Sequence, residues 1–155
     1  SYPVETITMM AAIASATEKA APYRAWNEER VHRDVRDPSY TVAYAVCMAA
    51  RELELDAIVV PTLSGRSARL VSAHRPTVPI HALSPGRETV RRCGLMWGVR
   101  AAYLRRHEVT EELILDACRR VVELGWCQPG QRVAVTAGLP SGVPGSTSLF
   151  QIQQL

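Results

Sequence analysis

The stretch over residues 57–67, A-I-V-V-P-T-L-S-G-R-S, decides how the rest of the chain is interpreted. Its first four residues, Ala57 to Val60, are apolar without alternation, which is typical of a strand covered on both faces in a parallel sheet. Residues 67–74 read as a helix. Between strand and helix, hydroxyl side chains surround a glycine, in Thr62, Ser64, Gly65 and Ser67. The stretch therefore predicts a strand that turns tightly into a helix.

The predicted turn is a candidate anion site. A strand-to-helix turn gathers free main-chain N–H groups and the positive end of the helix dipole at one small volume. Gly65 would allow a ligand to approach the main chain, and Arg66 adds a charged fork that suits phosphate geometry. Ser, Thr and Gly are also ordinary capping and turn residues, so a turn that binds nothing stays an open alternative. The leading hypothesis is a small ligand that carries phosphate.

The turn does not match a Walker loop, which needs Gly-x-x-x-x-Gly-Lys-Ser/Thr. The one lysine of the chain, Lys19, lies near the N-terminus. A nucleophilic role for Ser64 or Ser67 would require an adjacent base, and no Ser/His/Asp arrangement is evident. A small enzyme is therefore the least favoured of the functions considered.

Composition favours a single globular domain. With 155 residues and 47% apolar content the chain can bury a sizeable core. It has no apolar run of membrane length, and residues 1–5 show no signal-peptide pattern, so we expect a cytoplasmic protein with no membrane partner. We expect no bound metal and reduced thiols, because no Cys-x-x-Cys pair or ligand-spaced histidine accompanies the four cysteines, Cys47, Cys93, Cys118 and Cys127.

Charge argues against a nucleic-acid partner. The formal net charge is only +3. Between residues 24 and 37 arginines are interleaved with acidic residues, which is typical of a solvated mixed-charge face.

Strand and helix patterns alternate along the chain. We expect helices over residues 4–21, 40–53, 67–74, 87–93 and 110–124, with Asp37 as N-cap before Pro38 and Thr110 as the cap of the last helix. We expect strands over residues 57–60, 78–83, 99–104, 132–137 and 149–155, the last at a sheet edge with one wet face. Repeated strand-then-helix units predict an α/β fold with a mainly parallel sheet.

A second polar loop, residues 138–148, follows the strand over 132–137. Ligands of parallel sheets bind beyond the carboxyl ends of strands, and both polar loops leave strands at that edge. Their convergence strengthens the hypothesis of a small phosphorylated ligand. The alternative is that the second loop is only a hairpin connection.

The residues resemble a known family, the C-terminal domain of pyruvate kinase in its bacterial form. The resemblance covers nearly the whole chain and rests on separate motifs in the right order. These are residues 2–5 with the Met-rich helix, 57–69, 74–76, 79–80, the Gly-Leu-Met-Trp-Gly of 94–98, and 136–148.

The resemblance implies a three-layer α/β/α sandwich with a mixed five-stranded sheet, its last strand antiparallel. Residues 1–37 would form a helix and connector, and residues 38–155 the α/β core. In the family this domain is regulatory and contributes contacts to a homotetramer. Its phosphate turn carries over onto Thr62, Ser64, Gly65, Arg66 and Ser67, and its effector loop onto Gly142, Gly145, Ser146 and Thr147. The effectors are sugar phosphates or nucleoside monophosphates.

The chain departs from the animal and yeast members in one respect. Those members hold the second phosphate of a sugar with a Trp and an Arg near the helix that starts at Thr110. This chain lacks such a pair, and Arg105, Arg106 and His107 are only loosely placed to substitute for it. The sequence therefore favours a monophosphate over fructose 1,6-bisphosphate.

Catalysis would need another part of the parent enzyme. Pyruvate kinase transfers phosphate from phosphoenolpyruvate to ADP on a (β/α)₈ barrel, which takes about 250 residues. By the resemblance the parent uses Mg²⁺ and K⁺, whereas this chain would hold no cofactor and would be inactive alone. The chain is then either a regulatory piece whose partner is that barrel, or a free-standing phosphometabolite-binding protein.

Overall fold

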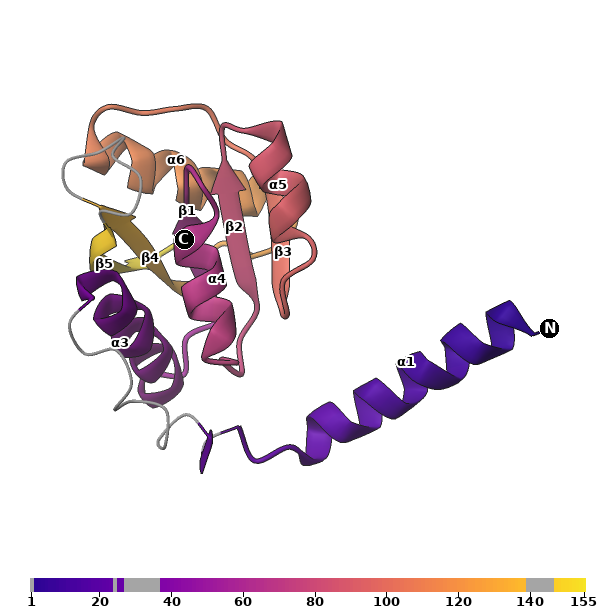
Figure 1. Cartoon of the computed structure of the whole chain (residues 1–155). Helices are drawn as coiled ribbons and strands as arrows, with labels where there is room; N and C mark the ends of the chain where they lie inside the picture. Colours follow the sequence, from indigo (N-terminus) through magenta and orange to yellow (C-terminus); the bar gives the residue numbers. More distant parts are fainter. Residues whose placement is uncertain (1, 24, 27–36, 139–146) are drawn as a thin grey trace. The chain divides into compact units, whose positions relative to one another are not determined.

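The computed structural model describes residues 2–23, 25–26, 37–138 and 147–155. They belong to two compact units, Ser1–Arg30 and Val31–Leu155 (Figure 1). The first unit contains helix α1 (Pro3–Ala20), with Pro3 in the first turn and Lys19 in the last. No residue of α1 is buried, and its apolar side chains are well exposed, among them Val4, Ile7, Met10 and Ile13. The helix thus presents much apolar surface, as its sequence predicts.

The second unit is an α/β sandwich. Its elements in chain order are α3 (Pro38–Glu52), β1 (Ala57–Pro61), α4 (Arg66–Ala73), β2 (Ile80–Ser84), α5 (Arg87–Cys93), β3 (Val99–Tyr103), α6 (Thr110–Glu123), β4 (Arg132–Gly138) and β5 (Thr147–Gln154). The sheet order is β3-β2-β1-β4-β5. The first four strands pair in parallel, and β5 runs antiparallel to β4 at the edge. The predicted mixed sheet and its antiparallel last strand are confirmed.

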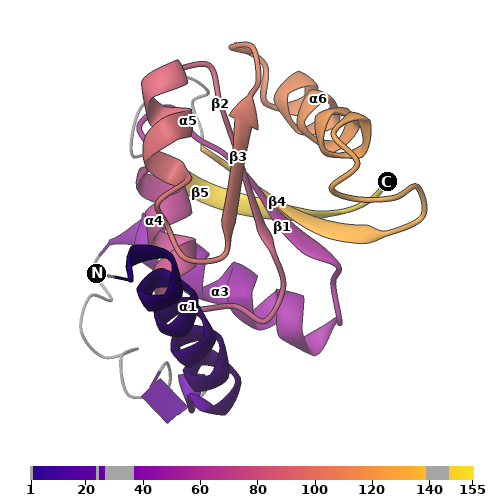
Figure 2. The same cartoon turned by 90° about the vertical axis from the view of Figure 1, so that its right-hand side faces the viewer.

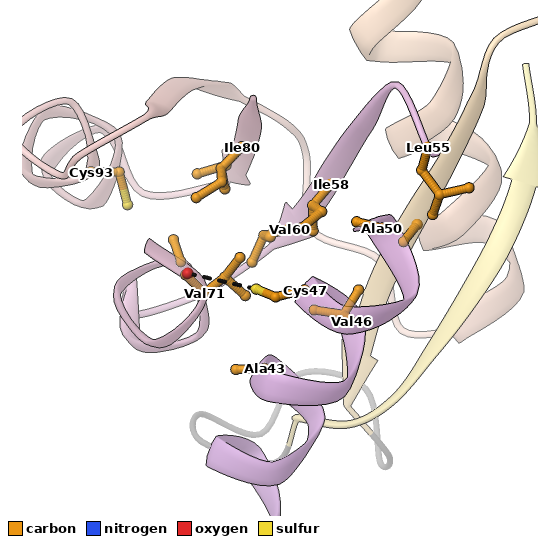
Figure 3. Close-up of a cluster of buried hydrophobic side chains, with 13 residues drawn as sticks. Ala43, Val46, Cys47, Ala50, Leu55, Ile58, Val60, Val71, Ile80 and Cys93 are labelled. Carbon is orange, nitrogen blue, oxygen red and sulfur yellow. Dashed lines mark hydrogen bonds between the residues drawn. The ribbon is translucent and has the colours of Figure 1, made fainter. Parts of the chain in front are cut away.

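Helices cover both faces of the sheet (Figure 2). On one face, α3, α4 and α5 pack over Ile58, Val60, Ile80 and Ala82 to form one apolar cluster (Figure 3). On the other, α6 packs over the alternate residues of the same strands, such as Val59 and Leu83. Residues Ala57 to Val60 of strand β1 are buried because they contribute to both clusters, which explains the unbroken apolar run.

Several expected boundaries differ from the structure by one or two residues, such as the start of β2 at Ile80 in place of residue 78. Thr110 is the first helical residue of α6, whereas Val109 occupies the cap position without a side-chain hydrogen bond. The first turn still has Glu111 and Glu112, which suit the positive end of the helix dipole. Thr147 lies in strand β5, opposite Gly138, because an irregularity in the ladder after Ala137 extends the pairing beyond the expected start at Leu149.

Asp37 caps α3 as predicted. Its Oδ1 atom accepts a hydrogen bond of 3.0 Å from the main-chain N–H of Ser39, and Pro38 occupies the first turn. An N-cap of this kind satisfies an amide that has no partner inside the helix.

The cysteines are buried or half-buried thiols with no disulfide. Burial raises the pKa of Cys47 to about 12 and that of Cys118 to about 11. Within the described residues no helix is long and apolar enough to span a membrane, and no group of His, Cys, Asp and Glu side chains is placed to hold a metal ion.

Candidate anion site at the β1–α4 turn

The turn between β1 and α4 lies at the carboxyl edge of the sheet. Strands β1 and β4 are parallel neighbours, with Val59 opposite Val135, so both polar loops leave the sheet at the same edge. Strands β4 and β5 are antiparallel neighbours, so the segment between them is also a hairpin connection. Of its predicted loop residues, Gly142, Gly145 and Ser146 lie outside the described residues.

Hydroxyl groups organise the turn internally. The main-chain N–H of Gly65 donates to Thr62 Oγ1 at 3.0 Å, and the N–H of Arg66 points to Ser64 Oγ at 3.4 Å. From helix α5, Thr89 Oγ1 donates to the carbonyl of Leu63 at 3.0 Å. Two of the predicted phosphate ligands, Thr62 and Ser64, therefore also serve as acceptors that fix the backbone of the turn.

Gly65 has a packing role in addition to the ligand contact that its sequence context suggests. It is the N-cap residue of α4 with φ +83°, in the left-handed region that favours glycine. A Cβ atom here would lie 3.2 Å from Cys93 Sγ and 3.5 Å from Thr89 Cγ2. The missing side chain thus allows close packing of the turn against α5.

Ser67 joins the turn to the last strand. Its Oγ atom lies 2.5 Å from Thr147 Oγ1, which makes a hydrogen bond between residues 80 positions apart. Ser67 is only 9% exposed and Thr147 is half-buried. The structure therefore brings together one residue predicted for the phosphate turn and one predicted for the effector loop.

The first turn of α4 retains free donors. Arg69 N–H makes the first hydrogen bond of the helix, to the Gly65 carbonyl at 3.0 Å. Among the described residues, the main-chain N–H groups of Ser67 and Ala68 have no hydrogen-bond acceptor. These amides, the Ser67 and Thr147 hydroxyls and the exposed Ser64 hydroxyl can donate to an anion.

Arg66 is engaged in an ion pair. Its Nη2 atom lies 2.5 Å from Oδ2 of Asp37, the residue that caps α3. The Arg66 side chain is 40% exposed and that of Asp37 is 27% exposed. Sequence reasoning identified Asp37 only as a helix cap and missed its contact with the site, since nothing in the local pattern links residues 29 positions apart.

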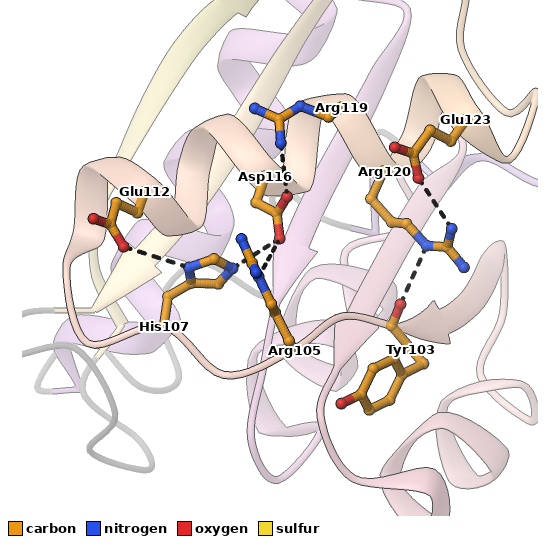
Figure 4. Close-up of polar contacts among 8 residues, drawn as sticks. All are labelled: Tyr103, Arg105, His107, Glu112, Asp116, Arg119, Arg120 and Glu123. Atoms are coloured by element: carbon orange, nitrogen blue, oxygen red, sulfur yellow. Dashed lines mark hydrogen bonds and ion pairs between the residues drawn. The ribbon is translucent and has the colours of Figure 1, made fainter.

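Two of the three side chains considered for a second phosphate, Arg105 and His107, lie before α6 and contact the acidic side chain of Asp116 on that helix (Figure 4). His107 Nε2 lies 2.8 Å from Asp116 Oδ2, and Arg105 Nε lies 3.4 Å from the same oxygen. Arg119 contacts the other oxygen at 3.3 Å. Burial on its own raises the pKa of Asp116. The hydrogen bond to His107 and the charge of Arg105 outweigh burial, so the pKa lies below its usual value. Arg105 and His107 are thus partners of a carboxylate.

Comparison with known proteins identifies the family of this fold. The family model described as pyruvate kinase, alpha/beta domain, matches residues 40–153. The chain belongs to this family. A pyruvate kinase from Clostridium acetobutylicum is 35% identical over 153 residues, which cover 99% of this chain and 32% of the relative. A pyruvate kinase from Staphylococcus aureus is 32% identical over 151 residues, which cover 97% of this chain and 26% of the relative.

The comparisons confirm the resemblance of the sequence to the pyruvate kinase C-terminal domain. The α/β family match begins within α3, at residue 40, whereas the alignments with whole relatives extend over nearly the full chain, α1 included. The chain spans 32% of the length of the Clostridium relative and 26% of the length of the Staphylococcus relative.

Proposed function

We propose that this chain is the regulatory part of a pyruvate kinase and that it binds a phosphorylated metabolite at the β1–α4 turn. The observation that carries the proposal is the Ser67–Thr147 hydrogen bond at the carboxyl edge of the sheet. It joins two polar segments, one of them beside the unpartnered amides of Ser67 and Ala68. Amides, hydroxyls and a helix dipole at one edge suit a phosphate group.

The ligand class follows from the side chains considered for a second phosphate. Of the three, Arg105 and His107 are paired with Asp116. A sugar monophosphate or a nucleoside monophosphate therefore fits better than a bisphosphate. The chain itself would need no cofactor, and Mg²⁺ and K⁺ would belong to the parent enzyme.

The partner is the catalytic barrel of the parent enzyme. The relatives are about three to four times longer than the aligned region, and α1 belongs to that region although it lies outside the α/β family match. We infer that the exposed apolar surface of α1 packs against the barrel, in a cytoplasmic enzyme that assembles as a homotetramer. The gene that encodes this chain should then hold barrel-coding sequence directly upstream of Tyr2.

A free-standing phosphometabolite-binding protein is the second candidate. The unit Val31–Leu155 builds apolar clusters on both faces of its own sheet, which is what an independent binding domain requires. A start codon immediately before Tyr2, with no barrel upstream, would favour this candidate over the first.

A thermal-shift screen tests binding for both candidates. The probes are AMP, ribose 5-phosphate, glucose 6-phosphate and fructose 1,6-bisphosphate. A ligand at about 100 times its dissociation constant stabilises the fold by about 2.7 kcal/mol. Ser64→Ala and Arg66→Ala should reduce the shift, whereas Thr77→Ala, an exposed residue before β2, should not. No shift with any phosphorylated probe would contradict the proposed function.

A further inference from the structure

The Asp37 carboxylate occupies the one guanidinium of the proposed phosphate site. Arg66 Nη2 lies 2.5 Å from Asp37 Oδ2, and within the described part of the chain Arg66 has no other side-chain partner. The cation and the carboxylate neutralise each other. The turn therefore presents hydroxyls, amides and a charge-balanced pair, not a free positive charge.

From this geometry we infer that Asp37 is a built-in competitor for Arg66, so that an incoming phosphate binds by displacing the carboxylate from the guanidinium. The inference rests on the proposed function, because it concerns the same site. A dianion at the turn is attracted by Arg66 and repelled by Asp37, and the repulsion grows when the two anions share one guanidinium. Asp37 thus lowers the affinity of the turn for phosphate.

The exchange also connects the site to helix α3. One oxygen of Asp37 accepts from Ser39 N–H at the start of α3, and the other contacts Arg66 at the start of α4. The carboxylate therefore links the first turns of two helices. When phosphate binds Arg66, the ion pair between Arg66 and Asp37 Oδ2 is broken. Asp37 Oδ1 still accepts the hydrogen bond from Ser39 N–H that caps α3.

Asp37→Asn is the substitution that separates the two roles of the residue. Asparagine is as good an N-cap as aspartate, so the bond from Ser39 N–H is retained while the charge is removed. The Asp37–Arg66 ion pair is partly exposed, so its loss costs little stability. The substitution also removes the negative charge that repels phosphate, so we expect the affinity for inorganic phosphate and AMP to rise about five- to tenfold. The gain should shrink at 1 M salt, where charges are screened within about 3 Å.

The matched control is Glu52→Gln. Glu52 lies at the other end of α3 and pairs with Arg51 at 2.7 Å, so the variant has the same change of net charge and loses a comparable ion pair away from the turn. Its affinity for phosphate should equal that of the unmodified chain. In an Arg66→Gln background, Asp37→Asn should bring a smaller gain, because the guanidinium for which the carboxylate competes is gone.

Titration calorimetry of the full chain with inorganic phosphate and with AMP decides the matter. Tighter binding by Asp37→Asn, with Glu52→Gln unchanged, supports the inference. If Ser67→Ala weakens binding but Asp37→Asn binds no more tightly than the unmodified chain, the inference is overturned and the proposed function stays in place. If neither the unmodified chain nor Asp37→Asn binds phosphate or AMP, the proposed function is overturned. The inferred competition is then overturned as well.

Discussion

The hydroxyl oxygens of Ser67 and Thr147 lie 2.5 Å apart, at the start of helix α4 and the start of strand β5. One of the two hydroxyls donates to the other, and either can take the role of donor. A phosphate oxygen that binds here can accept from one or both of them in addition to the free amides of α4. The pair therefore gives a specific expectation for substitution at either residue.

Ser67→Ala and Thr147→Val should each weaken the binding of AMP about tenfold. A hydrogen bond to a charged group contributes roughly 1.5–3 kcal/mol, and tenfold corresponds to about 1.4 kcal/mol. The double variant should lose less than the sum, since each single change leaves one hydroxyl of the pair without its partner. Titration calorimetry measures the cycle, with Thr77→Ala as control. Strictly additive losses would argue against joint binding by the two hydroxyls.

Gly65→Ala should destabilise the fold by about 2–5 kcal/mol. Left-handed backbone costs an L-residue about 1–2 kcal/mol, and overpacking a core position typically adds about 1–3 kcal/mol. The added Cβ would lie 3.2 Å from Cys93 Sγ. Gly130→Ala is the matched control, because its φ is +91° and nothing lies within 4 Å of the new atom. Urea unfolding should show a clearly larger loss for Gly65→Ala; equal losses would refute the packing role of Gly65 against α5.

Stability should fall between pH 7 and pH 5 because of His81. This imidazole is fully buried in β2, beside the Trp126 ring at 5.1 Å between centroids. Burial, with the charge of Arg100, lowers the pKa of His81 from 6.5 to about 4. As the pH falls below 6.5 the unfolded chain binds a proton that the folded chain does not, so unfolding is favoured by about 2 kcal/mol at pH 5.

His81→Leu removes this proton uptake and should flatten the pH dependence over the same interval. The free energy of unfolding is measured by urea titration at both pH values, and the comparison is of slopes with pH, so that a constant cost of the substitution cancels. Asp116 has a lowered pKa, and its contribution is lost only at more acidic pH, as the carboxylate is protonated. A variant with an unchanged slope would show that His81 does not titrate as its burial requires.

Fructose 1,6-bisphosphate should bind no more tightly than fructose 6-phosphate. Arg105 and His107 are held by Asp116 and add no free cation for a second phosphate. Asp116→Asn releases Arg105 and should raise the affinity for the bisphosphate relative to the monophosphate. A bisphosphate that binds the unmodified chain more than tenfold better would show that a second phosphate site exists elsewhere.

The sequence predicts the fold well because its main signals are local. Unbroken apolar runs mark strands covered on both faces, and the Asp37–Pro38 pair marks the start of α3. Sequence reasoning placed every strand, and the edge position of β5 follows from its alternating glutamines. Its errors at Thr110 and Thr147 are of one or two residues, where a cap or a ladder irregularity sets the boundary.

The site is less predictable because its decisive contacts are long-range. The turn itself can be predicted from the sequence, because its hydroxyl residues and its glycine lie close together along the chain. The Arg66–Asp37 ion pair and the packing of Gly65 against Cys93 depend on how α3 and α5 sit on the sheet, which no short pattern contains. These contacts add to the interpretation of two residues: Arg66 is paired with a carboxylate, and Gly65 packs against α5.

The most direct test of the account is a titration of the ¹⁵N-labelled chain with AMP, followed by amide chemical shifts. Phosphate binding at the turn predicts saturable shifts of the Gly65, Arg66, Ser67 and Ala68 amides, together with Thr147, and half-saturation at about tenfold higher AMP in Ser67→Ala. Saturable shifts confined to another part of the chain, with these amides unmoved, would contradict it.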